Sequence, residues 1–217
     1  MKVVITGSSN GIGKAIALKF LEENHTVYGI DIAPSTITNK NYTHYICDVT
    51  NKDCLPKLDD IEVLINNAGI QNNTENTIDV NLKGLINTTF IYGYQKAIKA
   101  IVNIASASAS TGSEFPYYAA SKGGVLSFTK NTAMEVAKYG ATCNSVSPGG
   151  VITSSNDHIL NDPKKYKAVL DETILNKWAS VEEIAELVYF LAVINKSITG
   201  QDIIIDNGES IKRTFIW

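Results

Sequence analysis

A tyrosine and a lysine one helical turn apart form the pair best suited to chemistry in this sequence. Tyr118-Ala119-Ala120-Ser121-Lys122 would place the phenol and the ammonium on one face of a helix. A phenol is a poor base near neutral pH, because its reference pKa is about 10. One ammonium at about 4 Å supplies about 4 kcal/mol at an effective dielectric of about 20, enough to bring that pKa near 7. The pair predicts acid–base chemistry with Lys122 lowering the pKa of Tyr118; the alternative is an exposed helical pair.

A serine precedes this pair at the end of an apolar segment. Ser106 directly follows the strand expected over residues 100–105, twelve positions before Tyr118. A hydroxyl there could hold a carbonyl oxygen while the phenol protonates it. Ser108 competes for this role, and a capping residue in a turn is the other alternative. We favour Ser106 because it follows the strand directly.

A glycine-rich turn joins the first expected strand to the first expected helix. Gly7, Gly11 and Gly13 have the spacing G-x-x-x-G-x-G, and glycine permits both positive φ and close approach of a ligand to the backbone. The helix start offers free N–H groups and the positive end of a dipole to a pyrophosphate. A tight turn without a ligand is the alternative. Its place at the first strand–helix junction favours nucleotide binding.

An aspartate ends the second expected strand, eighteen residues after Gly13. The carboxylate of Asp31 can accept hydrogen bonds from both hydroxyls of a ribose and would repel a 2′-phosphate. No Lys or Arg follows it nearby, and Asn10 leaves the glycine turn uncharged. These residues favour NAD over NADP, although Asp31 could also be a solvated carboxylate at a strand end.

Short strands rich in Val and Ile alternate with helical periodicity along the whole chain. This alternation predicts an α/β fold: a doubly wound, Rossmann-type parallel sheet of about seven strands with helices on both faces. No linker or shift in composition divides residues 1–217, so we expect a single domain. Four segments show helical periodicity, and their apolar positions include Ile16, Ile86, Ala133 and Leu187. The expected strands cover residues 2–6, 26–30, 44–47, 62–66, 100–105, 141–146 and 202–206.

Composition narrows the functional classes. The net charge of −3 indicates no nucleic-acid partner, and no apolar run approaches the roughly 20 residues of a membrane span. Cys47, Cys54 and Cys143 are odd in number and form no C-x-x-C pair, so we expect no disulfide framework and a reducing, cytoplasmic location. The scattered histidines predict no metal site.

Further motifs occur in a fixed order, and together they resemble those of the short-chain dehydrogenase/reductase superfamily, in its single-domain branch. The similarity runs from residue 2 to about residue 210. In order, the motifs are Thr6-Gly7-x-x-x-Gly11-Ile12-Gly13, Cys47-Asp48-Val49, Asn66-Asn67-Ala68-Gly69, Asp79-Val80-Asn81-Leu82, Ser106, Tyr118-x-x-x-Lys122, Ser147-Pro148-Gly149 with Thr153, and Thr199-Gly200-Gln201.

The resemblance implies a role for each matching residue. Tyr118 would be the catalytic acid/base, Lys122 would also hold the nicotinamide ribose, Ser106 would orient the carbonyl or hydroxyl, and Asn81 would support a proton relay; Asn81 could instead only bind backbone. Asp48 and Val49 would meet the adenine. The full set implied to bind the cofactor is Gly7, Ser9, Asn10, Gly11, Ile12, Gly13, Asp31, Asp48, Val49, Asn67, Ala68, Gly69, Tyr118, Lys122, Pro148, Gly149, Val151 and Thr153.

Several segments depart from the family pattern. Only twelve residues separate Val49 from Glu62, too few for a full crossover helix, which puts the wall of the adenine pocket in doubt. The family carries a substrate loop or lid at about residues 150–178, where we expect a mixed apolar and basic lining. The apolar tail, residues 211–217, would dock on its own sheet edge or on another subunit. The resemblance also implies a homodimer or homotetramer.

The sequence therefore predicts an oxidoreductase that transfers a hydride between NAD(H) and a small alcohol or ketone, with Tyr118 as acid/base. The alternative from another class is a scaffold or regulatory protein that senses NAD without turnover. An epimerase or dehydratase of the extended branch is disfavoured, because those chains need a large C-terminal substrate region. The substrate itself does not follow from the sequence.

Overall fold

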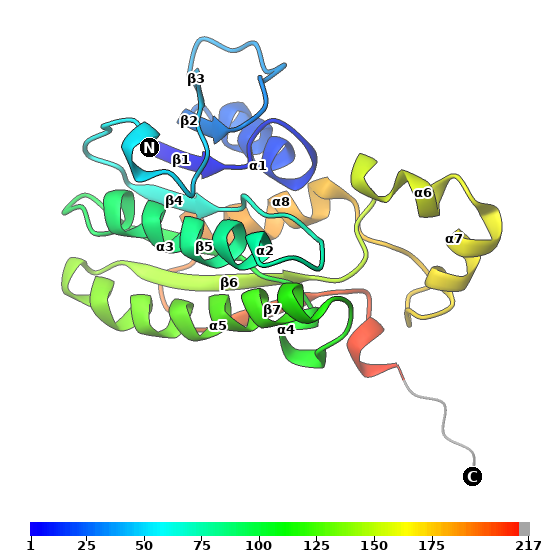
Figure 1. Ribbon diagram of the computed structural model, residues 1–217. Coiled ribbons are helices and arrows are strands. Elements are labelled where there is room, and N and C mark those ends of the chain that lie inside the picture. Colours follow the sequence, from blue (N-terminus) through cyan, green and yellow to red (C-terminus); the bar gives the residue numbers. More distant parts are fainter. Residues whose placement is uncertain (213–217) are drawn as a thin grey trace.

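Seven short strands form one parallel sheet in the computed structural model, which describes residues 1–212 (Figure 1). The strand order is β3-β2-β1-β4-β5-β6-β7, so the chain winds outward from β1 in one direction and then from β4 in the other. The predicted doubly wound fold is confirmed. The strands are β1 (Lys2–Thr6), β2 (Thr26–Asp31), β3 (Tyr42–Ile46), β4 (Val63–Asn66), β5 (Ala100–Ile104), β6 (Thr142–Pro148) and β7 (Asp202–Ile205).

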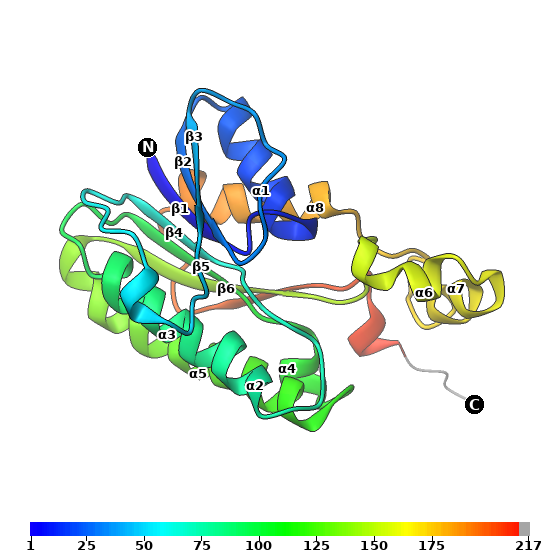
Figure 2. The ribbon, with the colours of Figure 1, turned by 45° about the horizontal axis from the view of Figure 1, so that its top comes forward.

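Helices cover both faces of the sheet, as Figures 1 and 2 show. Helices α1 (Gly11–Glu22) and α8 (Val181–Tyr189) pack together on one face. The other face carries α5 (Pro116–Val136) and a helix that runs from Asn76 to Gly93. That helix comprises α2 (Asn76–Ile78), a π-helical segment η2 (Asp79–Gly84), α3 (Leu85–Thr88) and a second π-helical segment η3 (Thr89–Gly93).

Alternation along the strands builds a core on each side of the sheet. Val3 and Ile5 of β1 pack with α1, while Val4 between them faces the opposite core with Leu64 and Tyr92. Successive side chains of a strand point to opposite faces, so a strand buried on both sides must be apolar throughout. The central strands are therefore fixed firmly, and the loops at their carboxyl ends start from defined positions.

Two buried asparagines connect the central strands to the helices beneath them. Asn66 Nδ2 donates to Asn103 Oδ1 at 2.9 Å and to Thr89 Oγ1 at 2.9 Å. Thr88 Oγ1 donates to Asn66 Oδ1, and Asn103 Nδ2 donates to Thr129 Oγ1 of α5. A buried network of this kind is stabilising only when its members are paired. It fixes the ends of β4 and β5 relative to α5.

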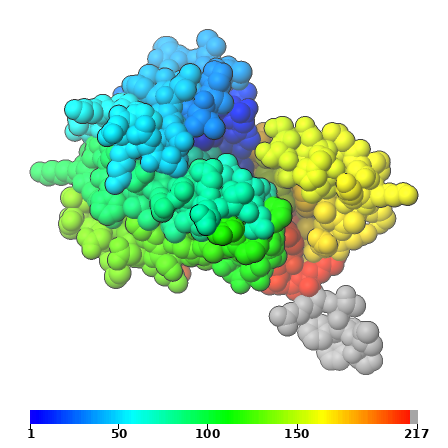
Figure 3. Space-filling view, viewed as in Figure 1, coloured from blue at the N-terminus to red at the C-terminus, as the bar shows by residue number. Residues whose placement is uncertain are grey.

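A separate segment stands beyond the carboxyl end of β6. Residues 150–178 carry η5 (Ser154–Asn156), α6 (Asp157–Leu160) and α7 (Pro163–Leu170). A parallel bridge between Val151 and Ala179 closes the base of this segment. Figure 3 shows it in yellow beside the body of the molecule, with the surface hollowed between them. Short helical turns also follow β5 and β7: α4 (Ser108–Thr111) and η7 (Glu209–Ile211).

The crossover between β3 and β4 contradicts one prediction from the sequence. It holds only a single turn, η1 (Lys52–Cys54), and a disulfide joins Cys47 to Cys54. Counting cysteines and searching for C-x-x-C pairs missed this bond, because the shortened loop turns back on itself and brings the two Cα atoms to 5.7 Å. Cys143 is buried and free.

For two further predictions, the structure gives findings on residues 1–212. Across residues 1–212, no helix has the length and apolar character needed to cross a membrane. Within the same residues, no three His, Cys, Asp or Glu side chains gather where they could hold a metal ion. Most of the apolar tail, residues 213–217, lies outside the described residues; Ile211, at its start, is 70% exposed.

Candidate active site

A cleft of about 1270 Å³ opens at the carboxyl ends of the strands, between the sheet and the 150–178 segment. Ligands of doubly wound sheets bind at this edge. One end of the cleft is the glycine turn after β1, and the other holds Tyr118 and the lid segment. The predicted residues that line it are Gly7, Asn10, Gly11, Ile12, Asp31, Asp48, Val49, Asn67, Ala68, Gly69, Ser106, Tyr118, Lys122, Pro148, Gly149, Val151 and Thr153.

The glycine turn has the conformation that the spacing predicts. Gly7 and Gly11 have positive φ values of 67° and 51°. A Cβ on Gly7 would come within 2.8 Å of the Cα of Ala68, so no larger residue fits there. Asn10 precedes α1 and makes no side-chain hydrogen bond to its first turn. The start of α1 is thus suited to accept a pyrophosphate.

Hydrogen bonds attach this turn to β4. Thr6 Oγ1 accepts from the backbone N–H groups of Asn67 and Ala68, each at 3.0 Å. The Asn67 side chain in turn donates to the carbonyls of Thr6 and Gly7. Asn67 therefore helps to fix the backbone of the glycine turn at the phosphate end of the cleft. Sequence reasoning did not assign a role to Thr6.

Asp31 lines the cleft and also accepts hydrogen bonds from the backbone around it. One carboxylate oxygen accepts from Ser9 N and the other from Ala33 N, both at 2.9 Å. Each oxygen retains a lone pair that can accept from a ribose hydroxyl. Lys14, which the sequence reasoning did not consider, donates to Thr36 Oγ1 at 2.8 Å and does not line the cleft.

Tyr118 and Lys122 lie on the same face of α5, as their spacing requires. The ammonium of Lys122 is 5.8 Å from the centre of the Tyr118 ring and donates to the carbonyl of Ile104 at 2.8 Å. Lys122 is 5% exposed, whereas Tyr118 is half-buried. The strand β5 therefore sets the position of the ammonium beside the phenol.

Burial dominates the protonation of this pair. It raises the pKa of Tyr118 to about 12, the Ser106 hydroxyl lowers that pKa, and the charge of Glu114 raises it. Burial also lowers the pKa of Lys122 to about 8, with Glu114 acting in the opposite direction. Desolvation of the phenol is the largest of these effects, and the ammonium of Lys122 pairs with the carbonyl of Ile104, so the expectation that Lys122 lowers the pKa of Tyr118 stays a prediction.

Ser106 follows β5 directly, and its side chain is positioned by the turn after that strand. Ser106 Oγ donates to Ser108 Oγ at 3.2 Å and accepts from the backbone N–H of Ser108. Only Ser106 lines the cleft, while its rival Ser108 lies behind it and is 2% exposed. The structure thus brings Ser106 and Tyr118 together at one end of the cleft.

Three predicted site residues do not line the cleft: Ser9, Gly13 and Asn81. Ser9 supports Asp31, and a Cβ on Gly13 would lie 2.0 Å from the carbonyl oxygen of Gly7, so Gly13 permits close packing. Asn81 is buried in η2, where it accepts from Ile70 N at 2.8 Å and donates to Ile70 O at 2.9 Å. It therefore holds the segment that follows Gly69 beside Lys122.

Carboxylates line the substrate end of the cleft, where the sequence led us to expect a mixed apolar and basic lining. Glu114, Glu172 and Glu209 line it, whereas the lysines of α7 do not. Glu209 Oε2 accepts from Gly150 N at 3.2 Å, and burial raises the pKa of this carboxyl. Sequence reasoning missed all three, since each lies in a loop or short turn without a recognisable motif.

Two residues of the 150–178 segment, His158 and Trp178, also line the cleft. Trp178 is 8% exposed and stacks edge-on against Tyr166, with ring centres 6.4 Å apart. Its ring lies over Gly150, where an added Cβ would come within 2.2 Å of Nε1. Trp178 therefore forms an apolar wall at the base of the lid.

This geometry can transfer a proton to a bound oxygen atom. A phenol and a serine hydroxyl share one end of a cleft, and at the other end a helix start and a carboxylate suit a dinucleotide. With a pKa of about 12, the phenol is protonated at neutral pH and can donate to an alkoxide, which is a stronger base.

Known proteins are similar to this chain along almost its whole length. A family model described as enoyl-(acyl carrier protein) reductase matches residues 7–210. A 3-oxoacyl-(acyl-carrier-protein) reductase of Thermotoga maritima is 32% identical, covering 94% of this chain and 96% of that protein. Among solved structures, a 4-hydroxyisoleucine dehydrogenase mutant complexed with NADH and succinate has a TM-score of 0.90 at 26% identity, covering 99% of this chain and 100% of that one. The aldohexose dehydrogenase of Thermoplasma acidophilum has a TM-score of 0.87 at 30% identity, covering 100% and 96%.

Proposed function

The chain belongs to the short-chain dehydrogenase/reductase family, and on that premise we propose that it transfers a hydride between NAD(H) and the carbinol or carbonyl carbon of a small substrate. Membership makes it an oxidoreductase; the cofactor preference, the substrate and the residue roles are the proposal. The observation that carries it is the placement of Tyr118, Ser106 and Lys122 at one end of a cleft whose other end fits a dinucleotide.

The residues at the dinucleotide end fit NAD(H). The start of α1 would hold the pyrophosphate, Asp31 the adenosine ribose, and Asp48 with Val49 the adenine. When bound, the cofactor supplies the hydride donor or acceptor. The carboxylate of Asp31 favours NAD over NADP, because a 2′-phosphate beside it would be repelled. One solved relative, 4-hydroxyisoleucine dehydrogenase, was complexed with NADH, which supports the same choice.

Tyr118 acts as the acid in the direction of reduction. Its hydroxyl donates its proton to the substrate oxygen as negative charge develops there, and the Ser106 hydroxyl, rotated away from Ser108, donates a second hydrogen bond to that oxygen. The ammonium of Lys122 offsets the negative charge left on the phenol and would bind the nicotinamide ribose. Asn81 positions the loop at Gly69 and Ile70 that borders Lys122. In oxidation, Tyr118 receives the proton of the alcohol.

Charge at the substrate end favours an uncharged, hydroxyl-bearing substrate. Glu114, Glu172 and Glu209 can accept hydrogen bonds from hydroxyl groups and would repel a carboxylate or phosphate. Trp178 offers an apolar wall to the carbon skeleton. Similarity to the aldohexose dehydrogenase supports the same class. A second candidate is reduction of a 3-oxoacyl thioester, which the 32% identity to the Thermotoga maritima reductase favours.

Two properties of the whole molecule complete the proposal. The outer faces of η3 and α5 expose Phe90 and Met134, by 60% and 70%, and such residues support assembly into a dimer or tetramer. A cytoplasmic location, where nicotinamide cofactors are abundant, is the simplest for this activity.

A spectrophotometric scan tests the proposal. NAD and NADP would be supplied with a panel of aldoses and simple alcohols, and NADH and NADPH with acetoacetyl thioesters, ketones and aldehydes. We expect oxidation of an uncharged polyhydroxylated substrate with NAD. Thioester reduction at a higher kcat/KM would select the second candidate. Tight NADH binding without turnover of any substrate would contradict the proposal and favour the NAD-sensing scaffold.

A further inference from the structure

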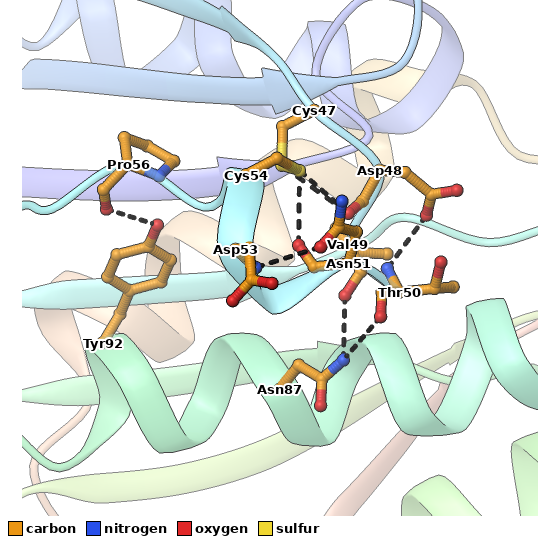
Figure 4. Close-up of a disulfide and its surroundings, with 10 residues drawn as sticks. All are labelled: Cys47, Asp48, Val49, Thr50, Asn51, Asp53, Cys54, Pro56, Asn87 and Tyr92. Atoms are coloured by element: carbon orange, nitrogen blue, oxygen red, sulfur yellow. Dashed lines mark hydrogen bonds between the residues drawn. A yellow bond between two sulfur atoms is a disulfide. The ribbon is translucent and has the colours of Figure 1, made fainter.

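The shortened crossover between β3 and β4 builds one wall of the cofactor cleft without a helix. Cys47 follows β3 directly, and its backbone N–H donates to the carbonyl of Asp31 at 2.9 Å. Figure 4 shows the disulfide from Cys47 to Cys54, the last residue of η1. The bond closes a ring of eight residues, which contains Asp48 and Val49 of the cleft lining.

The ring is held from outside at Val49 and Thr50, and the Val49 side chain is buried in the core beneath the sheet. The Asn87 side chain donates to the carbonyls of Val49 and Thr50, at 3.1 and 3.3 Å (Figure 4). Within the ring, Thr50 N bonds Asp48 and Asp53 N bonds Asn51, and both are contacts between near neighbours in an exposed loop. The disulfide is thus the covalent link that returns the ring to the end of β3.

The chain after the ring is anchored independently of the disulfide. Tyr92 donates to the carbonyl of Pro56 at 2.8 Å, and Gln95 donates to that of Leu58 at 2.7 Å. Leu55 is 7% exposed and belongs to the core beneath the sheet. Loss of the disulfide would therefore loosen residues 48–53, which Asn87 and the buried Val49 side chain would still hold, and leave the sheet, α5 and the catalytic end of the cleft in place.

We propose that the Cys47–Cys54 disulfide positions Asp48 and Val49 for the adenosine half of the cofactor, and that its reduction weakens cofactor binding without affecting the chemical step. The inference rests on the proposed function, because it takes NAD(H) as the ligand of this cleft. Cys47 and Cys54 are positioning residues here, since they act through the two residues beside Cys47.

The redox step balances with a dithiol as reductant. Cys54 is exposed, whereas Cys47 is 5% exposed, so a thiolate of the dithiol attacks the sulfur of Cys54 and Cys47 leaves as a thiolate. The second thiol of the reductant then displaces Cys54 from the mixed disulfide. Two electrons and two protons pass to the protein, which gains two thiols, while the reductant becomes a cyclic disulfide.

The test compares ligand affinity of the full chain in its oxidised form and after treatment with dithiothreitol. NADH, AMP and nicotinamide mononucleotide are titrated by calorimetry. We expect the Kd of NADH and of AMP to rise roughly five-fold or more on reduction, the lower end of usual coupling between sites. The Kd of nicotinamide mononucleotide and the kcat at saturating cofactor should stay unchanged.

A double variant, Cys47→Ser with Cys54→Ser, supplies the matched control. It should bind AMP and NADH like the reduced protein, and dithiothreitol should have no effect on it. A purely structural bond would lower the melting temperature on reduction but leave the Kd of AMP unchanged, which would overturn the inference. Titration of three thiols in the unfolded, air-oxidised chain would overturn it too. Failure of NADH to bind in either state would instead contradict the proposed function.

Discussion

Lys122 lies one helical turn from Tyr118, yet its ammonium donates to the carbonyl of Ile104 and stands 5.8 Å from the centre of the phenol ring. This arrangement keeps a cation close to the proton donor without a direct hydrogen bond between them. It also explains why both groups respond mainly to burial, which raises the pKa of Tyr118 and lowers that of Lys122. As pH rises, Lys122 therefore loses its charge before Tyr118 loses its proton.

The pH dependence of carbonyl reduction should follow the ionisation of Lys122. Its pKa is lowered to about 8, so the side chain is charged below that pH and neutral above it, while Tyr118, with a pKa of about 12, stays protonated. Because kcat/KM reports the free enzyme, it should be constant near neutrality and fall above pH about 8, approaching ten-fold per pH unit. Circular dichroism at each pH would show that the fold persists. A profile flat to pH about 10 would contradict the assignment.

Cofactor preference should depend on Asp31. In Asp31→Asn the charge that opposes a 2′-phosphate is removed, while the amide oxygen can keep one of the two hydrogen bonds that the carboxylate accepts from the backbone. The ratio of kcat/KM with NADPH to that with NADH should rise about ten-fold or more, as loss of one close repulsion implies. Asp53→Asn changes an exposed aspartate outside the cleft and should leave the ratio unaltered. An unchanged ratio in Asp31→Asn would show that this carboxylate does not select the cofactor.

Glu209 should discriminate between substrates by their charge. In Glu209→Gln the hydrogen bond from Gly150 N can persist, but a neutral oxygen accepts more weakly from a hydroxyl than a carboxylate does. We expect the KM of an uncharged polyhydroxylated substrate to rise about five-fold, while that of a carboxylate-bearing analogue falls. Glu182→Gln, an exposed position on α8, is the control. Equal changes for both substrates would refute a role in charge selection.

Assembly should depend on the exposed apolar residues of η3 and α5. Light scattering at micromolar concentration should give a dimer or tetramer for the unaltered chain, because Phe90 and Met134 are 60% and 70% exposed. The double change Phe90→Asp with Met134→Asp should give smaller species. Lys130→Asp alters charge on α5 without removing apolar surface and should leave the mass unchanged. A monomer for the unaltered chain would remove the proposed assembly.

The sheet and the spacing of Tyr118 and Lys122 were predictable because local sequence determines them. Strands buried on both faces must be continuously apolar, and Val3, Val4 and Ile5 reveal such a strand without any knowledge of the fold. An i, i+4 pair shares a face on any helix. The glycine turn is similarly local, since Gly7 requires positive φ wherever the turn occurs.

Features made by tertiary contact were not predictable in the same way. The Cys47–Cys54 bond arises because a loop turns back on itself, and neither spacing nor count reveals that. Glu209 enters the cleft only because the chain folds back after β7. The pKa of Tyr118 depends on burial, which the sequence does not quantify.

The central claim is that Tyr118 delivers the proton that completes hydride transfer. The most direct test is turnover and NADH affinity of Tyr118→Phe, with Tyr117→Phe, the more exposed neighbour, as the matched variant. Loss of the hydroxyl should lower kcat by at least about 100-fold, the lower range for general acid–base catalysis, with the Kd of NADH unchanged and Tyr117→Phe fully active. Turnover by Tyr118→Phe equal to that of the unaltered enzyme would contradict the account.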